Sequence, residues 1–267
     1  MKSCQKKVKI ISNTRIALCY YKLVLDASFI LRSASPGNFL MVKVAEGHGA
    51  SGETGPLLRR PLSVHKLSGR ASNSVELLYE VVGAGTRILS QKKAGEQVDI
   101  IGPLGNGFSV EAQAKKPGIV LVAGGIGVAP LVFLAQRLKG FKVIVLIGAG
   151  TKSQILCAED FKKLGCDVRI ATDDGTAGFH GRVTGLLEKF LAGGADKKYV
   201  LYGCGPKPML KVITDLSRRY RLPAQISLES HMACGIGACL GCVVKTRRGY
   251  ERVCKEGPVF DAGDLMW

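Results

Sequence analysis

Four cysteines near the C-terminal end of the chain are the residues whose types and spacing point most directly to chemistry. Cys234, Cys239 and Cys242 lie within the segment HMACGIGACLGC, and Cys254 follows after eleven intervening residues. Thiolates that converge on one point bind iron or zinc, and glycines between them let backbone N–H groups approach the sulfurs closely. The segment therefore predicts a metal centre.

The spacing of these cysteines separates two kinds of metal centre. C-x4-C-x2-C followed by a more distant fourth cysteine is the ligand pattern of plant-type [2Fe–2S] sites. A zinc site is the alternative, because Cys239 and Cys242 alone form a Cys-x-x-Cys pair, but zinc sites usually contain a second matched pair that is missing here. We expect a [2Fe–2S] cluster, rather than zinc or unligated thiols, on Cys234, Cys239, Cys242 and Cys254.

The segment RRPLS at 59–63 carries groups suited to a dinucleotide that contains a flavin. The Arg60 guanidinium could bind a diphosphate, and the Ser63 hydroxyl could hydrogen-bond the edge of a flavin ring. Pro61 would stiffen the strand between them. An arginine pair before a proline is more often a surface turn, so this segment alone is a weak signal.

The segment LLYEVVGAGTRILS at 77–90 offers a second place for phosphate. Gly83 and Gly85 would let backbone N–H groups approach it, and Thr86 would begin a helix whose N-terminus faces it. This segment alone is also compatible with an ordinary turn. The presence of both segments before a nucleotide-type sheet favours FAD binding.

The segment GIVLVAGGIGVAPL predicts a second nucleotide site, because its glycines lie between a buried strand and a helix. That is where a pyrophosphate binds at a helix N-terminus, although Pro130 takes the place of the last glycine of G-x-G-x-x-G. A purely structural strand–helix turn is the alternative. The candidate NAD-binding residues here are Gly124, Gly125, Gly127 and Pro130.

Two later strand ends add candidates, because ligands of open α/β sheets bind beyond the carboxyl ends of the strands. Asp173 of TDDG could contact ribose hydroxyls, with a plain Asx turn as the alternative. Cys204 is either a small buried apolar residue or a group beside the nicotinamide. An acidic residue about 20 positions after the glycines is missing, so NAD and NADP both stay open, with Lys152 or Arg169 as possible phosphate partners. The YGCGP segment supplies the candidates Gly203, Cys204, Gly205 and Pro206.

Composition limits the class of protein. The 267 residues carry a formal net charge of +17, but the basic residues are dispersed and accompany no recognisable nucleic-acid motif. Neither a signal peptide nor an apolar run of about 18 residues is visible, so we expect no membrane span. Nine cysteines without a secretory signal favour a reducing compartment, the cytoplasm, and metal or redox roles over disulfides.

The hydrophobic pattern changes near residue 105. Short alternating runs separated by Gly, Ser, Asn and Pro predict a small antiparallel β barrel over residues 1–105. Continuous apolar strands then alternate with amphipathic helices, which predicts a Rossmann-like parallel sheet over 106–225 with helices on both faces. The Cys- and Gly-rich residues 226–267 form a small third lobe that carries the cluster.

Taken in order, these segments resemble the ferredoxin–NADP reductase superfamily, and within it the electron-transfer subunits of NAD-dependent dihydroorotate dehydrogenases. The resemblance covers essentially the whole chain. Its motifs are RRPLS, GAGT, GPLGNGF, AGGIGVAPL, ATDDGTAGFHGRVT, YGCGPKPML and ES-MACGIGACLGC…VCKEGPVF, of which the last is the most specific.

The resemblance implies an FAD-binding barrel, an NAD-binding sheet and a C-terminal [2Fe–2S] lobe. Leu62 stands where more distant reductases place a flavin-stacking tyrosine, and Glu80 stands where a basic residue is common in relatives. The contacts at these two positions are therefore expected through the backbone. The implied FAD-binding residues are Arg60, Pro61, Leu62, Ser63, Leu78, Tyr79, Glu80, Gly85 and Thr86.

The three cofactors fit together because NAD accepts a hydride, a cluster passes single electrons, and a flavin does both. No acid–base pair or nucleophile for an organic substrate is evident, so the substrate is expected to be oxidised on another subunit. We expect a partner dihydroorotate dehydrogenase subunit with FMN, docked beside the cluster lobe, and from the family a heterotetramer of two plus two chains in pyrimidine biosynthesis.

Two alternatives remain at this stage. Related subunits serve hydrogenases, sulfide dehydrogenases and bifurcating transhydrogenases, with the same chemistry and a different partner. A basic zinc protein that binds nucleic acid is the other alternative, and it predicts a colourless protein with steeply salt-dependent binding.

Overall fold

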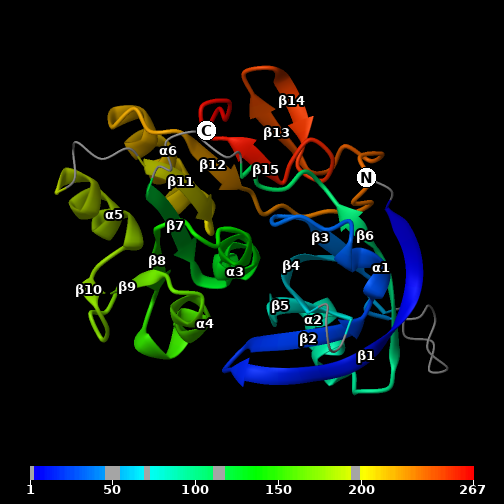
Figure 1. Cartoon of the computed structure of the whole chain (residues 1–267). Helices are drawn as coiled ribbons and strands as arrows, with labels where there is room; N and C mark the ends of the chain where they lie inside the picture. The colour runs from blue at the N-terminus through cyan, green and yellow to red at the C-terminus, as the bar shows by residue number, and fades with distance from the viewer. Residues whose placement is uncertain (1–2, 46–54, 69–72, 111–117, 194–198) are drawn as a thin grey trace.

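The computed structural model describes residues 3–45, 55–68, 73–110, 118–193 and 199–267. A closed barrel and a mostly parallel sheet lie side by side, and a small lobe that contains the cysteine loop lies above their junction (Figure 1). The fold class expected from the sequence is confirmed.

The barrel is antiparallel, with the strand order β1-β2-β5-β4-β3-β6. Buried and exposed residues alternate along its strands because one face of each strand points into the core. In the second strand, Leu23 and Leu25 are fully buried, while Lys22 and Val24 are partly exposed. A short α1 (Ser28–Leu31) and α2 (Ala84–Gln91) complete this half. The strands are β1 (Cys4–Ala17), β2 (Tyr20–Asp26), β3 (Phe39–Val42), β4 (Arg60–Ser68), β5 (Ser74–Glu80) and β6 (Gln97–Leu104).

The second half is a seven-stranded sheet in the order β10-β9-β8-β7-β11-β12-β15. All pairs are parallel except β12 with β15. The central β7 is apolar and buried along almost its whole length, as a strand covered on both faces must be. The strands are β7 (Gly118–Gly124), β8 (Val143–Ala149), β9 (Asp167–Thr172), β10 (Phe179–His180), β11 (Tyr199–Cys204), β12 (Ala224–Ser227) and β15 (Val259–Asp261).

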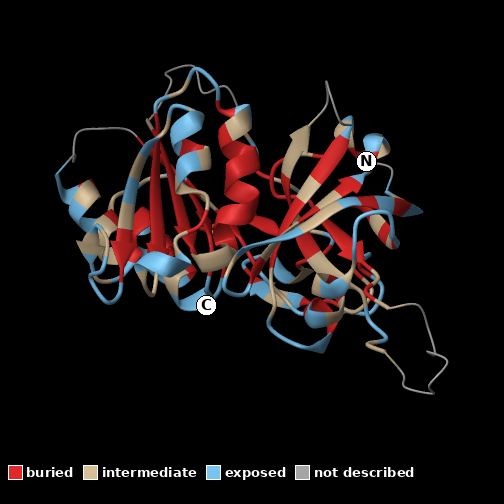
Figure 2. Cartoon of the chain, turned by 90° about the horizontal axis from the view of Figure 1, so that it is seen from below, coloured by how far each residue is buried: buried red, intermediate tan, exposed pale blue. Residues whose placement is uncertain are grey.

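Helices cover both faces of this sheet. On one face α5 (Val183–Ala192) and α6 (Lys207–Arg219) pack on the core, and on the other α3 (Val128–Arg137) and α4 (Ala158–Lys163) do so. Two single 3-10 turns, η1 (Gly125–Gly127) and η2 (Lys152–Gln154), follow strands β7 and β8. The buried helix in the middle of Figure 2 separates the two halves, and Phe133 of α3 packs into the core of the barrel.

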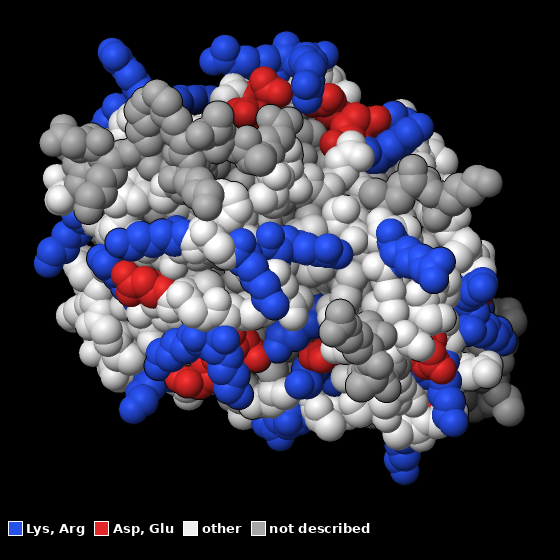
Figure 3. Space-filling view, in the orientation of Figure 1, with Lys and Arg blue, Asp and Glu red and all other residues white. Residues whose placement is uncertain are grey.

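The C-terminal lobe consists of a loop and the hairpin of β13 (Val243–Thr246) and β14 (Gly249–Arg252). The segment after it returns to the sheet, because β15 pairs with β12. Lys and Arg side chains are scattered over both halves of the face seen in Figure 3, with Asp and Glu interspersed. None of the described helices combines the length and apolar character needed to cross a bilayer.

Candidate functional site

A cavity of about 420 Å³ lies between the barrel and the sheet. Strands β4 and β5 supply one wall, and all the residues predicted to bind FAD line it except Gly85. Those lining residues are Arg60, Pro61, Leu62, Ser63, Leu78, Tyr79, Glu80 and Thr86.

Arg60 and the first turn of α2 form the most polar corner of this cavity. A Cβ atom at Gly85 would lie 2.5 Å from Nε and Nη2 of Arg60, so the guanidinium rests directly on the glycine. The Thr86 hydroxyl accepts hydrogen bonds from the backbone N–H of Val82 at 3.0 Å and of Gly83 at 3.3 Å. The helix therefore begins at Ala84, before the expected Thr86, with a positive guanidinium beside its N-terminus. This corner fits a phosphate group.

The neighbouring strand residues are held by the barrel core. Leu62 and Tyr79 are buried there, and the Tyr79 hydroxyl donates to Asn13 Oδ1 at 3.0 Å. Burial raises the pKa of Tyr79, which therefore stays protonated. Side chains fixed in this way keep the backbone edges of β4 and β5 in place along the cavity.

The opposite wall comes from the segment that leads into the cysteine loop. It carries Glu229, which is exposed to the cavity; the surrounding protein, and then the charge of Glu80, raise the pKa of the Glu229 carboxyl. The sequence interpretation did not assign this wall, although the ES before the first cysteine was part of the quoted motif. The wall is formed by Leu228, Glu229, Ser230, His231 and Met232, with Pro258 beside them.

The cysteine loop follows this wall directly. Cys234 Sγ accepts hydrogen bonds from the backbone N–H of Ala238 at 3.3 Å and of Cys239 at 3.4 Å. Burial alone would raise the pKa of Cys234, but the N–H groups of Cys239, Ile236 and Ala238, together with the Cys239 thiol, outweigh it and lower the pKa to about 6. The loop thus stabilises a thiolate before any metal binds.

The four thiols lie close enough to influence one another. Cys234 interacts with Cys239, and Cys254, whose N–H donates to Cys242 Sγ at 3.4 Å, interacts with Cys242. Burial and the Cys242 thiol raise the pKa of Cys254 to about 12. No three of these sulfurs form a group within 4.8 Å in the described structure, whereas the sulfurs around one tetrahedral zinc lie about 3.8 Å apart. Four thiols within one lobe are a donor set that fits a [2Fe–2S] cluster.

Glycines fix the loop against the barrel. Gly235 has φ +71°, and a Cβ atom there would lie 2.4 Å from Met41 Cγ of β3. Gly237 has φ +86°, and its carbonyl accepts from Arg252 Nη1 at 2.9 Å. Both positions require a residue that adopts the left-handed region without strain.

A second cavity, of about 410 Å³, lies at the carboxyl ends of strands β7, β8, β9 and β11. Gly124, Gly125, Asp173 and Pro206 line it, as expected for NAD-binding residues. Arg182 also lines it and was not predicted, although it belongs to the quoted GRVT. The structure thus places a guanidinium, a carboxylate and glycine turns around one space.

The remaining NAD candidates lie elsewhere. Pro130 and Cys204 line the first cavity. Gly127, Gly203 and Gly205 line neither cavity: a Cβ atom at Gly127 would lie 2.2 Å from the Cys204 carbonyl oxygen, and one at Gly203 would meet Ile226 and Ile213. These glycines allow close packing of turns and helices. Arg169, considered for NADP, instead bonds Asp167 at 2.9 Å and lies over the Phe190 ring.

The two cavities meet at the turns after β7 and β11. Gly125 faces the second cavity and Ile126 the first, while Cys204 faces the first and Pro206 the second. Burial raises the pKa of the Cys204 thiol, with a contribution from Glu229, so Cys204 is no thiolate at neutral pH. The two cavities are therefore lined by residues that are next to or near each other in the chain at these two turns.

Comparison with known proteins decides the family. Residues 229–266 match the model described as the iron–sulfur cluster binding domain of dihydroorotate dehydrogenase B. The chain is 41% identical over 265 residues, 97% of both chains, to the dihydroorotate dehydrogenase B (NAD(+)) electron transfer subunit of Desulforamulus reducens. It is 42% identical over 271 residues, 98% of this chain and 99% of the relative, to the Bacillus cereus (strain Q1) subunit of that name. The chain belongs to this family of electron transfer subunits.

Membership in the family agrees with the expected oxidoreductase subunit and its cofactors, FAD, a [2Fe–2S] cluster and NAD+. A chain from the structure of an NADH-dependent reduced ferredoxin–NADP oxidoreductase, studied for flavin-based electron bifurcation, superposes with a TM-score of 0.83 at 29% identity. That superposition covers 97% of this chain and 90% of the other. A cytochrome P450 reductase from Amycolatopsis, at 18% identity and a TM-score of 0.64, covers 82% of this chain and 67% of its own and shares the fold.

Proposed function

We propose that this chain is the subunit that takes electrons from a partner dihydroorotate dehydrogenase and delivers them to NAD+. The observation that carries the proposal is one continuous segment: residues 228–232 form a wall of the cavity between barrel and sheet and lead directly into the thiol loop. The two centres that exchange electrons are thereby built from adjacent residues.

Each cofactor has its own set of residues. The cluster is held by Cys234, Cys239, Cys242 and Cys254. FAD binds along β4 and β5 with its phosphates at Arg60, Gly85 and Thr86, with Pro61, Leu62, Ser63, Leu78, Tyr79 and Glu80 as the other contacts. NAD binds at Gly124, Gly125, Asp173 and Pro206, with Arg182 added, while Gly127, Pro130, Gly203, Cys204 and Gly205 shape the turns between the two cavities.

When bound, the cluster exchanges single electrons, NAD+ accepts a hydride, and the flavin does both, which places the flavin between them. The chain's own residues bind, orient and exclude water. Arg60 neutralises phosphate charge, and the thiol of buried Cys204 stays protonated beside the junction of the cavities. The Glu229 carboxyl, with its raised pKa, can hold a proton next to Glu80.

The partner would dock on the cluster lobe. Cys239 is exposed, and apolar side chains around the loop are exposed too, with 53% of Ile236, 60% of Leu240 and 76% of Tyr250 accessible. Apolar side chains beside an exposed cluster ligand are typical of a surface that a partner covers. We further propose that the partner subunit contains FMN, that two chains of each kind assemble, and that the complex is cytoplasmic, in keeping with its free thiols.

The division of the chain follows the same scheme. We propose a barrel domain over 1–105, a sheet domain over 106–225 and a cluster lobe over 226–267. The barrel order supports the first boundary, since β6 ends at Leu104. The lobe also contributes β15 to the sheet, so it docks on the second domain through backbone hydrogen bonds.

A second candidate function keeps the same cofactors and changes the partner. The likeness at 29% identity to a chain of an electron-bifurcating oxidoreductase favours it. In that case the chain would pass electrons between NAD(P)H and a partner other than a dihydroorotate-oxidising subunit.

One variant pair tests the electron path. Cys239→Ser removes an exposed cluster ligand, and Cys19→Ser removes an exposed cysteine outside the lobe as a control. In the complex with a co-expressed dihydroorotate dehydrogenase subunit, Cys239→Ser should lower dihydroorotate-to-NAD+ activity by at least about a hundredfold. NADH-to-dye activity should persist in both variants.

The purified, oxygen-free chain should also show flavin absorption near ~450 nm and a low-temperature EPR signal of a reduced two-iron cluster. Full dihydroorotate activity in Cys239→Ser, or a colourless protein with bound zinc, would contradict the proposal. A coloured protein that fails to bind the dihydroorotate-oxidising subunit would favour the second candidate.

A further inference from the structure

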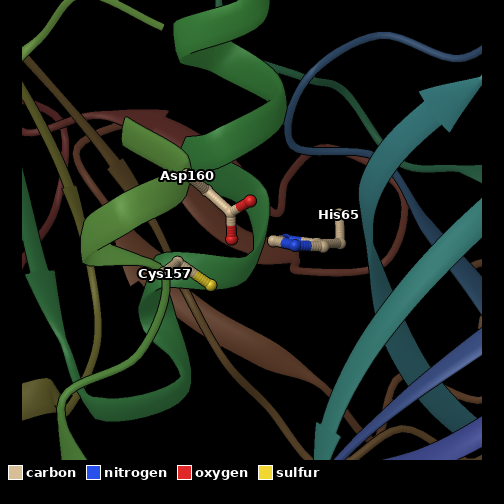
Figure 4. Close-up of side chains that lie close together, drawn as sticks. All are labelled: His65, Cys157 and Asp160. Atoms are coloured by element: carbon tan, nitrogen blue, oxygen red, sulfur yellow. The ribbon is translucent and has the colours of Figure 1, made fainter. Parts of the chain in front are cut away.

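A cluster of three potential ligands lies apart from the cysteine lobe, at the boundary between barrel and sheet. His65 projects from β4 of the barrel toward Asp160 of α4 and Cys157, the residue before α4, in the other half (Figure 4). One ligand atom from each residue lies within 4.8 Å of the other two. Nothing in the proposed electron path uses these three side chains.

The imidazole is set up as a ligand. His65 is buried, with 2% of its surface accessible, and its Nδ1 lies 3.0 Å from the carbonyl oxygen of Ala129 in α3. A carbonyl accepts a proton donor, so Nδ1 carries the hydrogen and Nε2 keeps its lone pair. A backbone carbonyl that fixes the ring in this way is the usual outer partner of a metal-binding histidine.

The thiol is held in a backbone conformation that cysteine rarely adopts. Cys157 has φ +59°, in the left-handed region, at the residue before α4. Burial and the charge of Asp160 raise the pKa of Cys157 to about 12. A free nucleophile would need the opposite shift, so the site is not suited to thiol catalysis. A metal ion is what would ionise this thiol.

Two ammonium groups oppose a cation here. Lys66 Nζ lies 2.6 Å from Asp160 Oδ1, and Lys22 is close enough to affect His65, Cys157 and Asp160. Without a metal ion, the Lys66 ammonium is the positive charge that pairs with the Asp160 carboxylate. A metal ion has to compete with it for Asp160.

We propose that His65, Cys157 and Asp160 form a binding site for a thiophilic divalent cation such as Zn²⁺, and that the ion fastens strand β4 of the barrel to α4 of the sheet domain. One nitrogen, one sulfur and one oxygen ligand suit Zn²⁺, with water in the fourth position. Ligand atoms around a tetrahedral zinc lie about 3.3–3.6 Å apart, so the three ligand atoms would have to approach one another by at most about 1.5 Å.

The site would act on the geometry of the flavin cavity. His65 lies two residues after Ser63 on β4, at an irregularity in the pairing of β4 with β5 between Val64 and Lys66. An ion at His65 would fix this strand relative to the domain that contains Gly124 and Gly125. Its binding should raise the thermal unfolding midpoint of the two-domain unit.

The test uses the complete chain with its cluster intact, so that the four lobe cysteines are already occupied. After removal of loosely bound metal, Zn²⁺ is titrated, and bound zinc and iron are counted by mass spectrometry. We expect about one zinc ion per chain in addition to the cluster iron. Zinc-edge X-ray absorption should show one sulfur at about 2.3 Å and nitrogen or oxygen neighbours at about 2.0–2.1 Å.

Four variants separate a ligand set from a structural contact. Cys157→Ser and Asp160→Asn should weaken zinc binding at least about tenfold, and Cys166→Ser, a half-buried thiol outside the site, should leave it unchanged. Lys66→Ala should tighten binding, because it removes the competing ammonium. If Lys66 and Asp160 formed only a structural ion pair, Lys66→Ala and Asp160→Asn would lower the stability of the protein equally and neither would change zinc binding. The flavin content of each variant shows that it is folded.

Two results would overturn the proposal. The first is zinc binding of equal strength in the wild type, Cys157→Ser and Asp160→Asn. The second is a shell of four sulfurs around zinc, which would place the ion in the cysteine lobe. The first result leaves the electron path untouched, because the Cys239→Ser comparison is read from activity and EPR. The second bears on both proposals, and the iron count and EPR signal of the same sample show whether zinc has replaced the cluster.

Discussion

The two cavities of this protein are built in different ways. The cavity between barrel and sheet is lined along one wall by consecutive residues of β4 and β5, whose side chains are anchored in the barrel core. The cavity at the sheet edge is lined by short runs of residues from the turns after several strands and from the first turns of helices α5 and α6. The first is a continuous surface, whereas the second is an assembly of turns.

This difference explains which residues the sequence could assign. A short motif such as RRPLS marks a strand on which four consecutive residues, 60–63, line one cavity with their backbone or side chains. A glycine after a strand has two possible roles, because it can either admit a ligand or admit another part of the chain. Gly125 lines its cavity, whereas Gly127 contacts the backbone of Cys204. Spacing alone does not distinguish these roles.

The largest expected effect comes from Gly127→Ala. The new Cβ would meet the Cys204 carbonyl oxygen at 2.2 Å and the Gly205 nitrogen at 2.7 Å, and backbone atoms at this crossing cannot move aside easily. We expect a loss of stability on the order of 3 kcal/mol and weaker binding in both cavities. Chemical unfolding measures the stability, and titrations with FAD and NADH measure the binding.

Gly185→Ala is the control for this prediction. A Cβ atom there would lie 3.5 Å from Phe179, an ordinary contact on helix α5, so stability should be unchanged or raised by about 1 kcal/mol. Equal stability of the two variants would mean that the contact between Gly127 and the backbone of residues 204–205 is looser than the structure shows.

The next largest effect should distinguish FAD binding at the Arg60 corner of the cavity from folding of the barrel. Gly85→Ala puts a Cβ where the Arg60 guanidinium now lies, whereas a Cβ at Gly83 has no atom within 4 Å. Because Arg60 is a flexible side chain, Gly85→Ala should fold normally and bind FAD about tenfold or more weakly. Gly83→Ala should bind it as the wild type does. Equal FAD dissociation constants for the two variants would contradict the proposal that Arg60 binds the FAD phosphates.

Much of the fold follows from patterns that a single strand or helix already contains. The apolar run of β7 predicts a strand buried on both faces, and the alternation of β2 predicts a barrel wall. The cysteine spacing likewise predicts that three thiols share one loop and that a fourth follows later in the same lobe. The wall around Glu229 and the cluster around His65 were not predictable, because each depends on a contact between segments far apart in the sequence.

A smaller effect should identify the role of the sheet-edge cavity. Arg182→Gln removes the guanidinium that lines it while leaving its glycine turns intact. Because this residue lies outside the flavin cavity, FAD content should stay normal while the KM for NADH rises about fivefold. Steady-state kinetics with an artificial electron acceptor measure the change. A fall in FAD content at constant KM would mean that the two cavities are not independent.

The smallest effect concerns Glu229, whose carboxyl faces the flavin cavity across from β5. An ionised carboxylate there opposes added electrons, so Glu229→Gln should raise the flavin midpoint potential, on the order of 30 mV for a two-electron couple. Because the surrounding protein and Glu80 raise the pKa of Glu229, the wild-type carboxyl stays protonated to a higher pH than usual. The difference between wild type and variant should therefore be absent at low pH and appear only as pH rises through that raised pKa. Potentials measured by spectroelectrochemistry over a pH series test this, with Ser230→Ala as a neutral control from the same wall. A constant offset at every pH would assign the shift to altered packing, and no offset at any pH would place the flavin ring away from this wall.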